Sequence, residues 1–177
     1  MKFLIHSMLL MMLAGPASAQ WKDWDYDLDQ ERKPWEELQA QLPPYPRNEN
    51  LVAFYSGSNS PHRFLIDLAS ISVGEDGVVR YTLVVRAGGG ATNVTFEGIR
   101  CDGATQRVYA FGHPGGQWSR ARNSEWREIA YREVNGHHYV LYGDFMCIGV
   151  RKREPKLLKE IVSALKSGGR KFGEGAP

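Results

Sequence analysis

Apolar and polar side chains alternate along the middle of the chain, with the period of two that is typical of half-buried β-strands. The pattern is clearest over residues 77–85 and the adjoining Arg86, where two sets of side chains point to opposite faces. One set is Val79, Tyr81, Leu83 and Val85, and the other is Arg80, Thr82, Val84 and Arg86. We therefore expect the first set to lie in the core and the second to be mostly in contact with water.

The rest of the central region continues this pattern. Strand-like runs occupy residues 50–55, 63–73, 77–85, 94–101 and 106–112. Short glycine-rich turns separate several of them, at GEDG (74–77), AGGGATN (87–93) and HPGG (113–116). Consecutive antiparallel strands joined by short turns form a meander. The pattern predicts an α+β domain built on an antiparallel meander of about five or six strands.

Two later segments have helical character. In NGHHYVLYGDFMC (135–147) we expect a helix, with a strand as the alternative, because a helix would gather the apolar residues on one side. Those residues are Val140, Leu141, Phe145 and Cys147. Near the C-terminus, Pro155 suits the start of a helix and Gly168 its end. The apolar positions between them have helical spacing, at Leu157, Leu158, Ile161, Val162 and Leu165.

The C-terminal segment, residues 151–177, is basic around this helix, with Lys156, Lys159 and Lys166 close to its apolar positions. One interpretation is a peripheral anchor that lies on anionic lipid. The favoured interpretation is a helix that packs on the domain or on a partner. The last residues are expected to be disordered.

The first 19 residues have the features of a signal peptide. Lys2 precedes an apolar run that ends at Leu13, and Ala17-Ser18-Ala19 has the small residues that signal peptidase requires. The apolar run is short for a membrane span. We therefore predict cleavage between Ala19 and Gln20 and export to the periplasm, without a lipid anchor because no cysteine follows the cleavage site.

Residues 20–41 are predicted to form an acidic and aromatic N-terminal segment that precedes the main domain, residues 42–150. Its aspartates are expected to face water, and they are Asp23, Asp25, Asp27 and Asp29. Pro34 suits the first turn of a short helix, because the first helical position has no need of its N–H group. Pro43, Pro44 and Pro46 would end that helix.

Cys101 and Cys147 are the two cysteines of the sequence. An isolated pair in an oxidising compartment predicts one disulfide. A loop of this length would stabilise the fold by about 4 kcal/mol in the chain-entropy model. A metal site and a nucleophilic thiol are the alternatives, but neither cysteine has a second ligand at CxxC or CxxH spacing.

Charge and hydropathy exclude two classes of partner. The chain has 22 Lys and Arg against 20 Asp and Glu, so it lacks the basic excess that nucleic-acid binding requires. Beyond the signal peptide, no apolar stretch is long enough to cross a membrane. We therefore expect that the protein does not bind nucleic acid and that the mature chain has no transmembrane segment.

Several motifs occur in an order that resembles a known family. They are LPPYPRNENLVAFY, RFLIDLASISVGEDGVVRYTLVVR, GATNVTFEGIRC and QWSRARNSEW. Together, over Leu42 to Cys147, they resemble the cryptic neisserial protein family of small exported domains from Gram-negative proteobacteria, whose function is uncharacterised. The sequence departs from that pattern at Glu128, where proline is expected in Trp-Arg-Pro-Ile.

A weaker likeness connects the chain to the surface-adhesin protein E family. It rests on the order of Asp67, Ser70-Ile71, Arg80, Cys101, Trp126-Arg127 and Cys147. This likeness implies a twisted antiparallel sheet with a helix tethered by the disulfide. It implies no adhesive activity, because no binding residue corresponds individually.

Familiar catalytic and cofactor motifs are missing from the sequence, and we expect no cofactor. AGGGATN lacks the lysine of a phosphate-binding loop, and no Gly-x-Ser-x-Gly occurs. His62, His113, His137 and His138 have no partner at metal-ligand spacing, and the adjacent pair would point in different directions. Asp67 and Glu97 could form a carboxylate pair only if the fold joined them, and Asp67 is better suited to capping a turn.

The segment QWSRARNSEWREI (117–129) is the best candidate for a binding site. Its proposed ligand-binding residues are Trp118, Arg120, Arg122, Asn123 and Trp126. Arginine beside tryptophan can stack, and the guanidinium fork suits carboxylate or phosphate groups. One interpretation is therefore a site for an anionic ligand of the cell envelope.

A structural role is the alternative for the same segment, and it is favoured. The arginines would then hold the loop by bonding to backbone carbonyls or to Glu97 and Glu125, and Trp126 would fill the core below the helix. The leading functional hypothesis is a non-catalytic binding or envelope-associated module. A small envelope hydrolase is the second, and it would require a carboxylate or histidine in a cleft beside these arginines.

Overall fold

A computed structural model describes residues 34–56, 60–130, 136–149 and 153–168 of the chain. From Trp35 onwards the chain forms one compact unit, which is described here. The predicted signal peptide and the aspartates of the N-terminal segment lie outside the described residues, as does the end of the basic tail.

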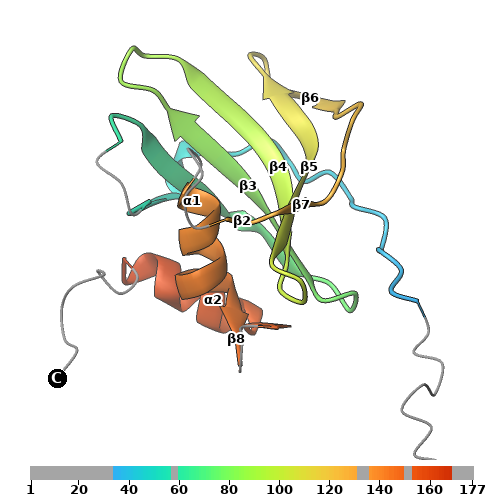
Figure 1. Cartoon of the computed structure of the whole chain (residues 1–177). Coiled ribbons are helices and arrows are strands. Elements are labelled where there is room, and N and C mark those ends of the chain that lie inside the picture. The colour runs from blue at the N-terminus through green and yellow to red at the C-terminus, as the bar shows by residue number, and fades with distance from the viewer. Residues whose placement is uncertain (1–33, 57–59, 131–135, 150–152, 169–177) are drawn as a thin grey trace, which may run out of the picture. The chain divides into compact units, whose positions relative to one another are not determined.

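A curved antiparallel sheet forms the body of the unit (Figure 1). Its strands follow one another along the chain in the spatial order β1 to β6, and β7 pairs with the other end of β5. The strands are β1 Leu51–Phe54, β2 Arg63–Val73, β3 Val78–Arg86, β4 Thr92–Arg100, β5 Thr105–His113, β6 Gln117–Arg120 and β7 Arg127–Glu128. The predicted α+β meander is therefore confirmed.

The predicted turns also form. At the β2–β3 turn, the N–H of Gly77 donates to the carbonyl of Gly74 at 3.0 Å, and Gly77 has φ +75°. Glycine reaches this left-handed conformation without the steric cost that a Cβ would add. The AGGGATN stretch similarly joins β3 to β4, as a hairpin turn rather than a phosphate-binding loop.

Helical segments follow the sheet and include the predicted helix between residues 136 and 146. The elements are α1 Gly136–Val140, the π-helix η2 Leu141–Met146, β8 Cys147–Ile148, β9 Glu154–Pro155 and α2 Leu158–Lys166, and a 3-10 turn, η1 Asn48–Asn50, precedes β1. Helix therefore replaces the strand alternative for this segment. No helix in the described part of the chain is both long and apolar enough to cross a membrane.

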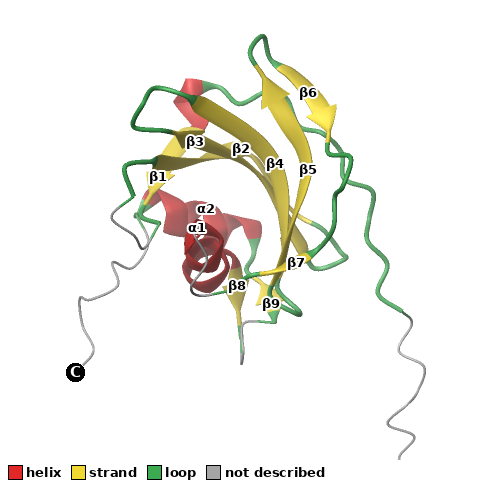
Figure 2. Cartoon of the chain, turned by 45° about the horizontal axis from the view of Figure 1, so that its top comes forward, coloured by secondary structure: helices red, strands yellow, loops and turns green. Residues whose placement is uncertain are grey.

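Helices α1 and α2 lie beneath the concave side of the sheet, which we call the helix face (Figure 2). Tyr81, Leu83 and Ile99 of the sheet pack there against Leu141 and Phe145 of η2. Ile161 and Leu165 of α2 are fully buried in the same cluster. The favoured packing of this helix on the domain therefore holds for Ile161 and Leu165, whereas Leu157 and Leu158 at its start are 59% and 44% exposed.

The opposite face of the sheet is also buried, which corrects the sequence-based expectation. Arg80, Thr82 and Val84, predicted to be mostly wet, are 5%, 0% and 3% exposed. An extended segment, residues 35–47, covers this face. We call the segment the strap and the face that it covers the strap face. Apolar residues of the strap join two small clusters with the sheet, through Ala40 and Tyr45 among others. Alternation alone could not reveal a cover that comes from a distant part of the chain.

The prediction of a short helix that starts at Pro34 is wrong, because residues 34–47 contain neither helix nor strand. A helix of this length is marginal by itself in water. The backbone instead makes tertiary bonds: Leu38 N–H donates to the Asp76 carboxylate at 2.9 Å, and the Leu38 carbonyl accepts from Arg80 at 2.9 Å. These long-range bonds stabilise the extended conformation in place of the local helical ones.

The predicted disulfide joins Cys101, just after β4, to Cys147 of β8, with their Cα atoms 5.6 Å apart. Both cysteines are buried in the helix-face core. The crosslink therefore ties the end of the helical layer to the sheet, in a loop that spans 46 positions of sequence.

Candidate functional site

The two tryptophans of the 117–129 segment bind the strap to the sheet. Trp118, on β6, donates from Nε1 to the carbonyl of Pro43 at 2.9 Å, and its ring packs against Tyr45 with centroids 5.6 Å apart. This half-buried residue holds the middle of the strap to the sheet. Its indole N–H and part of its ring are therefore already committed within the fold.

Trp126 holds the start of the strap and does not lie below the helix. Its Nε1 donates to Glu37 at 3.0 Å, and its ring meets Trp35 edge-on at 5.8 Å. The residue that fills the core from this segment is Ile129, which is 8% exposed and belongs to the helix-face cluster. The predicted core role thus belongs to a neighbour three positions further along the chain.

Ser124 fixes the loop between the two tryptophans, a role that the sequence did not indicate. Its hydroxyl donates to the Val108 carbonyl at 2.5 Å and accepts from Arg107 Nε at 2.8 Å. Arg107 in turn pairs with Glu37 of the strap. The arginine that organises this region is therefore Arg107, on β5, and serines are too common in loops for sequence alone to single out Ser124.

Arg122 and Asn123 line a hollow of about 250 Å³ between this loop and β5. Gln106, Val108 and Phe111 of β5 form its sheet side, and Glu125 and Arg127 also border it. Phe111 is 46% exposed, an unusual exposure for a large apolar ring. The structure thus brings two of the five predicted ligand-binding residues to one hollow.

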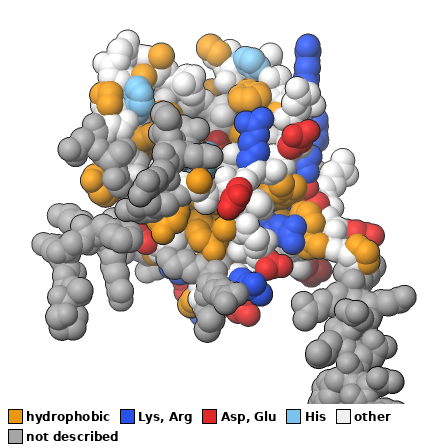
Figure 3. Space-filling view, in the orientation of Figure 1, with side chains coloured by type: hydrophobic (Ala, Val, Ile, Leu, Met, Phe, Trp, Pro, Cys, Tyr) orange, Lys and Arg blue, Asp and Glu red, His pale blue; other side chains and the backbone are white. Residues whose placement is uncertain are grey.

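The remaining predicted residue, Arg120, lies at the exposed end of β6 and is not part of the hollow's lining. In the described part of the chain, no side-chain hydrogen bond or ion pair is formed by Arg120, Arg122 or Arg127. Basic side chains protrude from the surface over β6 and the segment after it (Figure 3). These arginines therefore do not hold the loop through Glu97 or Glu125, as the structural alternative supposed.

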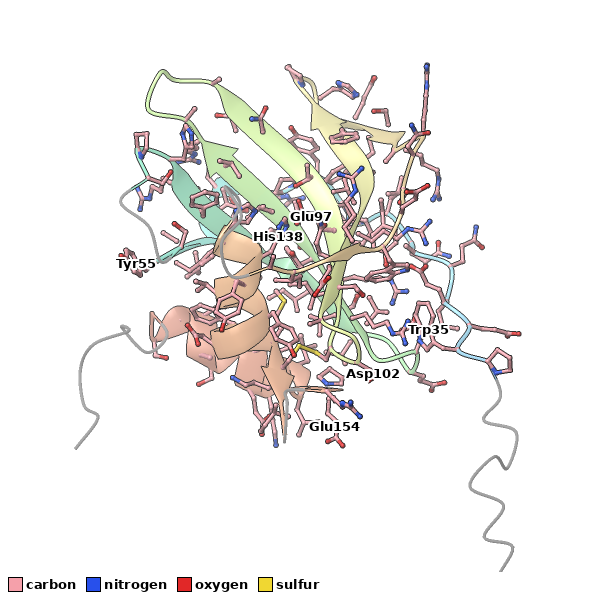
Figure 4. The ribbon with its side chains drawn as sticks, in the orientation of Figure 1. Trp35, Tyr55, Glu97, Asp102, His138 and Glu154 are labelled. Carbon is pink, nitrogen blue, oxygen red and sulfur yellow. A yellow bond between two sulfur atoms is a disulfide. The ribbon has the colours of Figure 1, made fainter. Side chains whose placement is uncertain are left out.

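A second polar group is buried on the helix face, between β4 and α1. Glu97, 3% exposed, accepts hydrogen bonds from Tyr81 Oη at 3.0 Å and Thr95 Oγ1 at 2.6 Å. His138 Nε2 lies 2.8 Å from the same carboxylate, and the two side chains point toward each other (Figure 4). Beside it, His137 stacks on Phe64 with centroids 4.6 Å apart.

The surroundings shift the pKa values of these groups. Burial by itself raises the pKa of Glu97, but His138 and the hydroxyl of Thr95 favour the carboxylate and lower it to about 2. Burial lowers the pKa of His137 to about 4, and the adjacent His138 acts in the same direction. The cluster therefore holds a carboxylate that stays ionised and an imidazole that stays neutral near neutral pH.

Glu97 has its hydrogen-bonding partners within the fold, and it lines neither the hollow beside β5 nor a second hollow near η1. Asp67 does not join Glu97, because the register pairs Asp67 with Thr82 and Glu97 with the adjacent Tyr81, which puts the two carboxylates on opposite faces. Among the described residues, no three His, Cys, Asp or Glu side chains form a metal-ligand group. The pairing of His138 with Glu97 is a long-range contact that sequence spacing could not reveal.

The fold and the site define a small α+β domain with a helical layer tethered by a disulfide on one face, a strap on the other, and an open polar hollow at one edge. Residues 30–166 match the model of the CNP1-like family, and the chain belongs to this family. The match extends beyond residues 42–147 and takes in the strap and α2. No curated protein and no solved structure matches the chain.

Proposed function

We propose that the protein is a non-catalytic binding module of the bacterial cell envelope, which takes a small anionic group in the hollow beside β5. The single observation that carries this proposal is the pair Arg122 and Arg127, which border one hollow without a partner elsewhere in the described chain. Asn123 and Gln106 add amide donors. Guanidinium and amide groups together suit phosphate or carboxylate oxygens.

Binding is favoured over hydrolysis by the setting of the acidic group. Glu125 borders the same hollow, so the carboxylate that a hydrolase would require is present beside the arginines. However, Glu125 is exposed, and the hollow is open to water. General acid–base catalysis gains most from a side chain that is sheltered from water, and Glu125 lies at the surface.

Export to the periplasm is part of the proposal. The disulfide between Cys101 and Cys147 supports it, since such crosslinks persist in oxidising compartments. The signal-peptide features of residues 1–19 support it independently. Fractionation of cells that express the full chain should recover the protein in the periplasm, with Gln20 as its first residue; a cytoplasmic protein that retains Met1 would contradict this part.

The binding proposal is tested by titrating the oxidised protein with inorganic phosphate and with acetate, and following the amide resonances of residues 121–127 by NMR. Saturable shifts are expected in the wild type. They should weaken several-fold in Arg122→Ala and Arg127→Ala. Arg120→Ala is the matched control, because Arg120 is exposed nearby but does not line the hollow. Equal loss in all three variants, or no saturable shift, would contradict a localised site.

A further inference from the structure

A second hollow, of about 190 Å³, lies on the strap face near η1. Asp67 and Ser70 form its wall on β2. Tyr45, Arg47 and Asn50 border it from the strap and from η1. The hollow is thus lined by polar groups of three separate segments, away from the arginine hollow beside β5.

Asp67 is the unusual member of this lining. It is 2% exposed, and only Oδ1 has a partner in the described chain, the N–H of Ala69 at 3.1 Å. The side chain thus bonds the nearby backbone, as the turn-capping prediction supposed, but it does so within β2 and not in a turn. The other oxygen, Oδ2, accepts no hydrogen bond from the described residues and is not fully enclosed, so it is open to the hollow, and no described cation pairs with the carboxylate. Buried carboxylates are ordinarily paired or fully hydrogen-bonded, because an isolated buried charge is costly.

The fold around Asp67 does not depend on its free oxygen. The pairing of β2 with β3 shifts register between Asp67 and Ser72, which makes an irregularity in the strand. Ser70 closes it, since its hydroxyl donates to the Asp67 carbonyl at 2.8 Å and accepts from Thr82 N–H at 2.8 Å. The backbone is therefore held by Ser70, and the Oδ2 atom of Asp67 remains available to a ligand.

The charge balance at this hollow calls for a cation. Arg47 is the basic residue that borders it, but its guanidinium lies 3.8 Å from Glu49, with both side chains largely in water. Burial raises the pKa of Asp67, and the bond from Ala69 only partly opposes this, so the charged form lacks full compensation. A ligand that brings a positive charge with N–H donors would supply what the fold leaves out.

We propose that this hollow binds a primary ammonium group, with Asp67 as its ion-pair partner and the Asn50 side chain as a second acceptor. A primary ammonium carries three N–H donors, which suits a carboxylate oxygen together with neighbouring polar oxygens. The ring of Tyr45 borders the hollow and provides an apolar surface for the carbon chain of the amine. The ammonium group belongs either to a free small amine or to a lysine side chain of a peptide.

The test is an NMR titration of the oxidised protein with methylammonium chloride, against sodium chloride at the same ionic strength. The amides of Ala69 and Ser70 report on the hollow. The affinity of so small a ligand is limited by its number of atoms, and two heavy atoms correspond to a Kd of about 10 mM or weaker. The titration therefore extends to roughly a few hundred mM. Saturable shifts with methylammonium but not with sodium are expected.

Asp67→Asn is the decisive variant, because asparagine keeps an oxygen that can accept from Ala69. It should abolish the saturable shifts. Asp102→Asn is the matched control, since Asp102 is an exposed carboxylate outside the hollow, and it should leave them unchanged. Persistence of the shifts in Asp67→Asn, or their absence from the wild type, would overturn the proposal.

Thermal unfolding of Asp67→Asn provides a second test, because a carboxylate that only stabilises the fold would shift the melting midpoint in the opposite direction. The raised pKa of Asp67 means that its contribution to stability is present below the ordinary pKa of 3.8 and is lost as the pH rises. Asp67→Asn should therefore raise the melting midpoint at neutral pH and leave it unchanged in acid. A lowered midpoint at neutral pH would assign the carboxylate to the fold and overturn the proposal.

The source of the ammonium group is resolved by repeating the titration with a short lysine peptide, blocked at both ends. Tighter binding of the peptide than of methylammonium assigns the hollow to lysine side chains of a partner protein. Binding of methylammonium without binding of the peptide assigns it to free small amines. Both outcomes uphold the ammonium site, provided that Asp67→Asn removes the binding.

Discussion

The two faces of the sheet are covered in different ways. On the helix face, α1, η2 and α2 bury a large apolar cluster, and one disulfide crosses it. On the strap face, an extended segment without helix or strand covers two smaller clusters. The helix face therefore depends chiefly on apolar burial, and the strap face depends more on polar bonds between side chains.

The polar bonds of the strap face converge on Glu37 and Asp76. Glu37 accepts from Tyr109 Oη at 2.6 Å and also from Arg107 and Trp126. Asp76 pairs with Arg80 at 2.6 Å, with both side chains buried. Burial by itself raises the pKa of Asp76, but the hydrogen bond and charge of Arg80, together with the N–H groups of Leu38 and Val78, outweigh it, so the net shift is downward. An extended segment can thus be fixed on a sheet by a few charged residues.

The largest expected effect comes from Glu97, a carboxylate buried on the helix face. Glu97→Ala leaves His138 and the Tyr81 hydroxyl without their buried partner. Removal of one member of a buried pair costs about 3–5 kcal/mol. Urea unfolding followed by circular dichroism should show this loss, whereas Glu128→Ala, at an exposed position of β7, should change stability by less than about 0.5 kcal/mol. A cost for Glu97→Ala as small as that of the control would mean that apolar packing alone sustains this face.

Acid should weaken the same face. His137 has a folded-state pKa of about 4 against an ordinary 6.5, so the unfolded chain binds the proton more readily between these values. Stability is therefore full above about pH 6.5 and falls as the pH is lowered towards 4, by about 3 kcal/mol. The carboxylate of Glu97, with its pKa lowered to about 2, adds a further loss between pH 4.5 and 2.

Unfolding free energies measured from neutral pH down to acid separate these two groups. His137→Phe keeps an aromatic ring on Phe64 and removes the titrating imidazole, so it should flatten the curve above about pH 4 and leave the lower part. A wild-type curve that is flat above pH 4 would contradict the burial of a neutral His137.

A smaller effect is expected on the strap face, where Glu37→Ala tests how much the polar bonds contribute. The variant leaves Arg107, Tyr109 and Trp126 without their common acceptor, at a cost of about 1–3 kcal/mol. Tryptophan fluorescence should shift to longer wavelength as Trp35 and Trp126 gain water. Glu36→Ala, one position earlier and exposed, is the control and should behave as the wild type. If Glu37→Ala leaves the emission unchanged, apolar contacts hold the strap.

The same contrast explains which parts of the fold could be predicted from the sequence. The period of two in β3, the glycine turns and the helical spacing of Ile161 and Leu165 are local signals, and the elements they predicted all form. The burial of Arg80 and the extended strap depend on contacts between segments about 40 positions apart, such as the bond from Arg80 to the Leu38 carbonyl. No local pattern carries that information.

The residues of the candidate site likewise differ in how far they could be predicted from local sequence. Polarity singled out Arg122 and Asn123, which line the hollow, because exposed polar residues in a loop are visible in the sequence. It could not separate them from Trp118 and Trp126, whose indole N–H groups are used by Pro43 and Glu37. Asp67 was assigned only to its turn, since its burial depends on how the strap and β2 meet.

The smallest expected effects belong to Arg120 and Arg122. Neither side chain is hydrogen-bonded or ion-paired within the described residues, and both are exposed. Substitution by alanine at such positions changes stability by no more than about 0.5 kcal/mol, which for a domain of this size is a shift of about 1–2 °C in melting midpoint. Thermal melting of the oxidised protein checks this directly. A drop of several degrees in either variant would return these arginines to the fold and remove the main support for an anionic ligand. Unchanged midpoints, together with a loss of phosphate shifts in Arg122→Ala alone, would leave ligand binding as the use of Arg122 and set it apart from Arg120.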